Sequence, residues 1–250
     1  MSTNQQATNP LLTIIIPARN EAMHLPKLLT SLCRQDYRRL LHTKVFVADA
    51  ESTDGTVSAA VAYGDRLNIT IIPGGLPSVG RNAGARLADT PYVLFLDADV
   101  ELTDRTMLRR ALAEMQKREL HCLTTNIGCN YGRFSDDALF AASNLCQRVG
   151  SWIRPFGTGM FLLFSKGEFD RLGGFHEQAL FAEDYLLTQK VAVRRFGILS
   201  GKIYTSNRRF RKMGRMHVAM MFLRTAMNSF NESYYLRDQK YWQESSQKAS

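Results

Sequence analysis

The segment from Pro91 to Asp99, PYVLFLDAD, constrains the fold of this chain more than any other stretch. Its apolar run, Tyr92 to Leu96, is too short for a helix and rich in strand-forming residues, which predicts a fully buried strand. The run ends at two carboxylates, Asp97 and Asp99, which the alternation of side chains along a strand would point the same way. In an open α/β sheet, ligands bind at the carboxyl ends of the strands. Two carboxylates held close there repel each other unless a positive group lies beside them, and a divalent cation bound to a phosphate is the natural candidate.

Helical and strand-like segments alternate along the chain, and this pattern predicts a mostly parallel α/β sheet flanked by helices. Strands are expected at 11–16, 44–48, 68–72, 92–96, 120–126, 157–164 and 198–205. Helices are expected at about 22–33, after 52–54, and at 78–88, 103–118, 135–149 and 181–195. Pro17 is expected to end the first strand because it has no N–H to donate, and Thr103 is the expected N-cap of its helix. A chain of 250 residues, 45% of them hydrophobic, is expected to form one core.

The composition narrows the classes of partner. The net charge of +9 suits nucleic acid, an anionic membrane or phosphorylated small molecules, but the basic clusters interleaved with aromatics that bind single strands are not evident. The four cysteines form no CxxC pair and are expected to be buried free thiols in a reducing compartment. Without a signal sequence or a long uncharged apolar stretch, a cytoplasmic protein is expected, with peripheral attachment to the inner face of a membrane left open.

Five polar elements follow one another in an order that identifies a family. They are the strand end IPARNE (16–21), Asp49 followed by STDGT (52–56), GRNAG (80–84), the Asp97-Ala-Asp99 triplet, and the pair Glu183-Asp184 after a Gly-Gly-Phe turn. In this order they resemble the inverting family 2 glycosyltransferases of the GT-A fold, from about Leu11 to Phe210. The resemblance implies transfer of a sugar from a nucleotide-diphosphate sugar, with a UDP-sugar as the first expectation. It implies no nucleic-acid partner.

The resemblance also implies a role for each matched residue on the donor side. The first loop and Asp49 would hold the base and ribose of the nucleotide, and Arg81 would border the diphosphate and the sugar. Asp99, with Asp97 beside it, would hold Mg²⁺ or Mn²⁺ between the two phosphates. The residues of the first loop are Pro17, Ala18, Arg19, Asn20 and Glu21.

On the acceptor side, the resemblance implies that Asp184 is the general base, with Glu183 supporting the site. Apart from the resemblance, Gly159 could let the backbone approach a ligand closely or could form only a tight turn. Arg208 and Arg209 could close over the diphosphate of the donor. The Gln-x-x-Arg-Trp element of processive synthases is absent from the sequence, which favours addition of one sugar over polymer synthesis.

Simpler interpretations stay open for several of these residues. Asp49 could only cap a loop, the Glu183-Asp184 pair could only suit a helix dipole, and the basic cluster that begins at Arg208 could be a solvated turn. Among whole-protein alternatives, a non-catalytic nucleotide-sugar-binding or membrane-associated module of the same fold stays open. A nucleotidyltransferase is disfavoured because no Gly-rich phosphate loop follows the first strand.

The expected domain organisation has three parts. Residues 1–10 form a disordered tail, and residues 11–212 form the glycosyltransferase domain, with a nucleotide-sugar half at about 11–100 and an acceptor half at about 101–212. Residues 213–250 form a helical extension whose methionine-rich segment either packs on the core or lies on anionic lipid. In the second case, a lipid-linked or membrane-proximal acceptor would follow; the acceptor itself is not indicated by the sequence.

Overall fold

The computed structural model describes residues 11–130 and 134–206, together with the single residues Arg208, Gly214, Met220 and Arg224. One sheet of eight strands runs through this part of the chain, in the order β3-β2-β1-β4-β7-β6-β8-β5. The strands are β1 (Leu12–Ala18), β2 (Lys44–Asp49), β3 (Asn68–Pro73), β4 (Tyr92–Leu96), β5 (Val100–Glu101), β6 (Cys122–Asn130), β7 (Phe161–Ser165) and β8 (Phe196–Ser206). The helices are α1 (Leu25–Cys33), α2 (Thr56–Val61), α3 (Pro77–Arg86), α4 (Met107–Lys117), α5 (Phe134–Gly150), α6 (Lys166–Arg171) and α7 (Glu183–Thr188).

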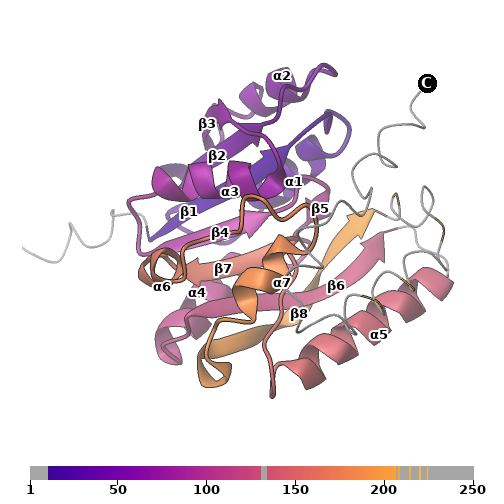
Figure 1. Cartoon of the computed structure of the whole chain (residues 1–250). Helices are drawn as coiled ribbons and strands as arrows, with labels where there is room; N and C mark the ends of the chain where they lie inside the picture. Colours follow the sequence, from indigo (N-terminus) through magenta and orange to yellow (C-terminus); the bar gives the residue numbers. More distant parts are fainter. Residues whose placement is uncertain are drawn as a thin grey trace, which may run out of the picture.

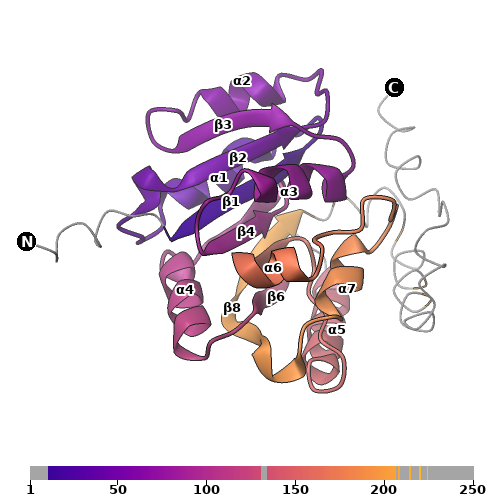
Figure 2. The ribbon, with the colours of Figure 1, turned by 60° about the vertical axis from the view of Figure 1, so that its left-hand side comes forward.

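The sheet is parallel in its first half and mixed in its second. Strands β3, β2, β1 and β4 are all parallel neighbours, and β6 and β8 also run parallel. Strand β7 lies antiparallel between β4 and β6, and β5 is an antiparallel edge beside β8. Figures 1 and 2 show α2 at one end of the molecule and α5 at the opposite end. The expected mostly parallel sheet flanked by helices is confirmed.

The core lies on both faces of the sheet because the strands of the first half are apolar throughout. Along β1, Ile14 and Ile16 belong to the cluster that contains the buried leucines of α1 and α4, whereas Ile15 faces the other cluster. The second cluster is aromatic, and Phe95 of β4 contacts the rings of Phe169 and Phe175 there. These two layers fix the carboxyl ends of β1, β2 and β4 at one edge of the sheet.

Several element boundaries differ from the sequence-based expectation. Strand β1 continues through Pro17 to Ala18, because beyond Ile15 it pairs only with β2 and its open side tolerates a missing N–H. Helix α4 begins at Met107 rather than near Thr103. Helix α7 covers only 183–188 of the expected 181–195. It ends early because the chain must turn back into the sheet, where β8 pairs with β6. The expected tail of residues 1–10 and the helix within 213–250 lie outside the described residues, apart from the single positions named above.

The thiols are free as expected, but the expectation that all four are buried is wrong. Cys122 is buried and Cys33 and Cys129 are half-buried, whereas Cys146 is exposed because it lies on the outer side of α5. Within the residues that the structure describes, no helix is both long and apolar enough to cross a bilayer.

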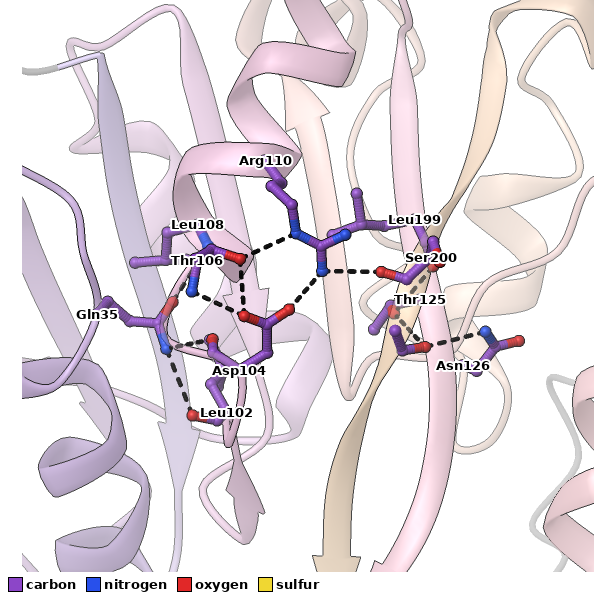
Figure 3. A network of polar contacts seen from close by, with 11 residues as sticks. Gln35, Leu102, Asp104, Thr106, Leu108, Arg110, Thr125, Asn126, Leu199 and Ser200 are labelled. Atoms are coloured by element: carbon purple, nitrogen blue, oxygen red, sulfur yellow. Dashed lines mark hydrogen bonds and ion pairs between the residues drawn. The ribbon is translucent and has the colours of Figure 1, made fainter.

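A polar network fixes the chain just after the Asp97-Ala-Asp99 turn (Figure 3). The side chain of Asp104 accepts the N–H and hydroxyl of Thr106 and an Nη2–H of Arg110, and the same Nη2 donates to the carbonyl of Ser200 in β8. Gln35, following α1, donates to the carbonyls of residues 102 and 104. The network therefore joins α1, α4 and β8 around the loop between β5 and α4.

Candidate active site

Helix α3 carries the first element of the site. Its glycines allow it to lie directly on the sheet: a side-chain carbon at Gly84 would come within 2.6 Å of Ile15, and one at Gly80 within 3.0 Å of Ala48. Such a close approach of helix and strand is a reason for glycine at both positions. The approach brings Arg81, on the same helix, under the ends of the strands, where its side chain is only 3% exposed.

The buried guanidinium of Arg81 bridges two carboxylates from distant parts of the chain. Its Nη2 lies 2.6 Å from Asp97 Oδ1, and its Nη1 lies 2.5 Å from Glu183 Oε1. The ring of Phe175 lies 5.2 Å from its Cζ. Burial lowers the pKa of Arg81, but the negative charges of Asp97, Glu183 and Asp184 outweigh this and raise it above its ordinary value. This arginine therefore stays charged and joins the end of β4 to the start of α7.

Asp184 lies next to this bridge and is held by backbone N–H groups. Its Oδ2 accepts the N–H of Gly159 at 2.7 Å, and its Oδ1 accepts the N–H of Tyr185 at 2.8 Å. Burial and the negative charge of Glu183 raise the pKa of Asp184 to about 6, although Arg81 and the two N–H groups lower it. A carboxylate with such a pKa is ionised at neutral pH yet basic enough to take a proton.

Two backbone features position this carboxylate. Residue 182, an alanine, has a φ of 53°, a left-handed conformation uncommon for a residue with a side chain, and this turn starts α7 at Glu183. Gly159 lies so close to the guanidinium of Arg81 that a side-chain carbon there would overlap it. The sequence predicted that the backbone at Gly159 approaches a ligand; in this structure it closely approaches Arg81, and the approach to a ligand stays a prediction.

A second arginine neutralises the other carboxylate of the triplet. Asp99 Oδ2 lies 3.3 Å from Ser206 Oγ at the end of β8 and 3.6 Å from Arg208 Nη2. The fork of Arg208 also binds both oxygens of Glu21, at 2.6 and 3.1 Å. Burial raises the pKa of Glu21, and Arg208 partly offsets this. In this structure, Arg208 thus links the first loop to the triplet.

Asp97 and Asp99 lie beyond the end of the strand, so the expected alternation of strand side chains does not apply to them. Strand β4 ends at Leu96, and the triplet forms a turn in which the N–H of Val100 bonds to the carbonyl of Asp97 at 3.3 Å. Each carboxylate nevertheless has a positive group beside it, as the repulsion of like charges requires.

The first loop is braced against the loop that follows β2. Asn20 has a φ of 53°, its N–H donates to Ser52 Oγ, and its side-chain oxygen accepts the N–H of Thr53. The N–H of Glu21 donates to Thr56 Oγ1 at 2.8 Å. Asn20 was expected to reach a base; in this structure its amide oxygen shapes the loop.

The other donor-side candidates lie around this pair of loops. Asp49 ends β2, and its Oδ1 is buried without a hydrogen bond. Pro17 and Ala18 end β1, Ala18 being buried, while Arg19 is exposed. Arg209 lies outside the described residues.

The sequence and the fold were compared with those of known proteins. The model of a family described as "Glycosyl transferase family 2" matches residues 13–173, more than half of the chain. The chain belongs to glycosyltransferase family 2.

Curated relatives and solved structures agree with this assignment. A 4,4'-diaponeurosporenoate glycosyltransferase from Staphylococcus haemolyticus is 29% identical over 187 residues, covering 73% of this chain and 47% of the relative. The structure of Staphylococcus aureus TarS residues 1–349 with UDP-GlcNAc has a TM-score of 0.64 and 24% identity, over 79% of this chain and 58% of that one. The structure of the mannosyltransferase PcManGT from Pyrobaculum calidifontis, with GDP-Man and Mn²⁺, has a TM-score of 0.64 and 23% identity. The match covers 88% of this chain and 65% of that one. The chain spans 47% of the length of that Staphylococcus haemolyticus relative and 34% of the length of Staphylococcus aureus TarS.

Two carboxylates of this site have oxygens that could be ligands of a divalent cation that also binds a phosphate. Asp97 and Asp99 each give one oxygen to a protein partner, Oδ1 to Arg81 and Oδ2 to Ser206, and each carboxylate has a second oxygen. Among the described residues, no group of three or more His, Cys, Asp or Glu could hold an ion by itself. Hard cations such as Mg²⁺ take one or two carboxylates and complete their shell with waters and substrate phosphates, which matches this pair.

One further residue of the site was missed by sequence reasoning. The side chain of Asn82 binds the Gly-Gly-Phe turn at 173–175. Its Oδ1 accepts the N–H of Phe175, and its Nδ2 donates to the carbonyl of Phe175 and to the side chain of Glu177. This turn precedes α7, so Asn82 helps to set where α7 begins. The available signal was its place beside Arg81 in a small-residue helix, where a buried amide needs partners.

Proposed function

We propose that the chain is a metal-dependent inverting glycosyltransferase that moves one sugar from a nucleotide-diphosphate sugar to an acceptor hydroxyl. Membership of the family and the fold support the reaction class. The observation that carries the assignment of residues is the buried bridge of Arg81 between Asp97 and Glu183. This bridge joins Asp97, one of the two carboxylates proposed for the metal, to Glu183, which precedes the proposed base Asp184 in α7.

In the proposed reaction, Asp184 accepts the proton of the acceptor hydroxyl. The acceptor oxygen forms a bond to the anomeric carbon while the bond from that carbon to the diphosphate breaks, so one displacement inverts the configuration. The N–H groups of Gly159 and Tyr185 fix the orientation of the Asp184 carboxylate, and its raised pKa suits a base that works near neutral pH. Glu183 is bound to Arg81, which suits a supporting role.

Asp97 and Asp99 are the proposed ligands of Mg²⁺ or Mn²⁺, which when bound would neutralise charge on the leaving diphosphate. Arg208 lies beside Asp99, and its planar fork suits a phosphate as well as it suits Glu21. Asp49, with one buried oxygen that has no hydrogen bond, is the proposed partner of the nucleotide base or ribose. The loop from Pro17 to Glu21 borders that place.

The donor is proposed to be a UDP-sugar first, with guanine and thymine nucleotides as the next candidates. Solved neighbours bind UDP-GlcNAc in one case and GDP-Man with Mn²⁺ in another. Both nucleotide classes therefore belong in a donor screen. Because a ligand that binds only the folded state stabilises it in proportion to the logarithm of its concentration over Kd, the correct donor should raise Tm most.

The test is a thermal-shift and hydrolysis screen against UDP-, GDP- and dTDP-sugars, with Mn²⁺, with Mg²⁺ and with a chelator. We expect one nucleotide class to stabilise the protein and to be hydrolysed only when a metal ion is present. Asp99→Ala should lose the metal-dependent part of the shift, whereas Asp89→Ala, which removes an exposed carboxylate paired with Lys44, should keep it. Metal-dependent binding without any turnover would favour the non-catalytic module instead.

A further inference from the structure

The outer side of α5 and the turn after it expose a group of large apolar side chains. Leu145 and Val149 are 62% and 57% exposed, and Trp152 and Ile153 are each 81% exposed. These four residues are called the α5 tip below. Val149 follows Leu145 by four residues, and Trp152 and Ile153 follow Val149 by three and four, so the group extends along one side of the helix and onto the turn after it. Large apolar side chains gathered on one exposed side are uncommon on a monomer and mark an interaction surface.

The exposure of the α5 tip is fixed by the structure around it. The inner side of α5 is held to β6 by Asn144, whose side chain accepts the N–H of Ile127 and donates to its carbonyl. After the helix, the N–H groups of Trp152 and Ile153 donate to the carbonyls of residues 149 and 150. Figures 1 and 2 show α5 at the end of the molecule opposite α2. The tip therefore lies on a formed, outward-facing turn.

Two arginines lie beside the α5 tip, one of which, Arg118, is paired with Glu114. Arg148 is exposed between Leu145 and Val149, and both Arg148 and Trp152 line a hollow of about 550 Å³ against β8, together with Arg118. The carboxylates of α5 are in its first turn, at the other end of the helix. The whole chain carries a net charge of +9. Apolar side chains that include a tryptophan, with arginines beside them, suit the interface of an anionic bilayer.

We propose that the α5 tip is a membrane-docking surface that inserts Trp152 and Ile153 between the headgroups of anionic lipids. Arg148 and Arg118 would contact the lipid phosphates from the neighbouring hollow. A second copy of the chain is a poorer fit for this surface, because a stable protein interface takes roughly 20–30 residues a side, far more than this tip offers. The surface differs from the methionine-rich segment within 213–250, to which the sequence alone assigned a possible lipid contact.

Docking here would also tie the membrane to the candidate active site. The segment from Ile153 leads in six residues to Gly159, which holds Asp184. On the way, Arg154 lies 5.8 Å from the ring of Tyr185, and the N–H of Gly157 donates to Thr188 in α7. An acceptor borne by the membrane would suit this arrangement, although the docking surface does not depend on the proposed transfer reaction.

The test is co-sedimentation of the full chain with vesicles of phosphatidylcholine, with and without phosphatidylglycerol. We expect binding only to the anionic vesicles and weakening by salt. Trp152→Ser with Ile153→Ser should weaken this binding by roughly tenfold or more, since each side chain loses its burial. A matched pair elsewhere, Leu41→Ser with Val61→Ser, removes side chains that are 66% and 60% exposed and should change nothing.

Two further readouts separate this surface from others. Arg148→Gln should weaken anionic binding by about fivefold, whereas Arg34→Gln, an exposed arginine after α1, should not. In a Trp242→Phe background, Trp152 is the single tryptophan, and its fluorescence should shift to the blue on anionic vesicles. Equal vesicle binding by the wild type and the Trp152/Ile153 variant would overturn the proposal. So would a dimer in sedimentation velocity that the same variant converts to monomer.

Discussion

Replacing Arg81 by methionine removes the charge that joins both halves of the candidate site. The side chain is 3% exposed, so two carboxylates, Asp97 and Glu183, would lose a buried partner at once. Breaking a buried ion pair from one side costs about 3–5 kcal/mol. For a chain of this size, about 3 kcal/mol corresponds to a fall in Tm of roughly 6–12 °C. Arg86→Met on the same helix removes an exposed ion pair with Glu177 and should cost about 0–1 kcal/mol.

The same change should move the acid limb of the pH–rate profile. Arg81 lowers the pKa of Asp184, so without it this pKa should rise above about 6. Each unit of upward shift costs a factor of about ten in rate on the acid side of the limb. Arg81→Lys keeps a positive charge but not the planar fork. It should therefore lose stability, because it reaches only one carboxylate, while the limb moves less than in Arg81→Met.

The assay combines thermal unfolding at neutral pH with donor turnover across the acid range for the wild type, both Arg81 variants and Arg86→Met. If Arg81→Met has the Tm and the acid limb of the wild type, Arg81 does not connect Asp97 with the Glu183-Asp184 pair, and the electrostatic reasoning is wrong. If Arg81→Met does not fold, Arg81→Lys carries the comparison.

Three smaller predictions test other contacts. Gly159→Ala places a carbon against the buried guanidinium and should lower turnover by about 10²-fold, whereas Gly167→Ala, where the carbon meets open space, should match the wild type. Thr56→Val removes the acceptor of the Glu21 N–H and should cost about 1–3 kcal/mol in denaturant unfolding, with Thr56→Ser close to wild type. Because the folded pKa of Asp184 is raised to about 6 from 3.8, its ionisation destabilises the fold as pH rises through that range. Asp184→Asn should therefore shift Tm upward more at about pH 8 than at about pH 4. An equal shift at both pH values would rule out destabilisation by the ionised Asp184.

The sequence predicted best what depends on local pattern. The apolar run Tyr92–Leu96 is β4 to the residue, and the leucines spaced along α1 are all buried. These predictions are correct because the pattern of buried and exposed positions depends on only a few neighbouring residues. The predicted ends of α7 were wrong. The observed ends are set by the left-handed conformation of residue 182 and by the return of the chain to the sheet at β8.

The candidate site was found as a set of residues, but not as a set of contacts. Order along the chain pointed to Arg81, Asp97 and Glu183. Nothing local shows that the first would bridge the other two, since Glu183 is 102 residues away in the sequence. Likewise, no local pattern showed that the amide oxygen of Asn20 accepts the N–H of Thr53. Long-range polar partners depend on the packing of α3 and α7 on the sheet, which no local pattern encodes.

The most direct test of the account is single-turnover sugar transfer by Asp184→Asn, measured beside donor binding by calorimetry in the presence of Mn²⁺. The account predicts a loss of about 10²–10⁴-fold in the rate of transfer, as for removal of a general base, with donor affinity close to that of the wild type. Transfer at the wild-type rate would show that another group takes the proton, and the proposed role of Asp184 would be wrong.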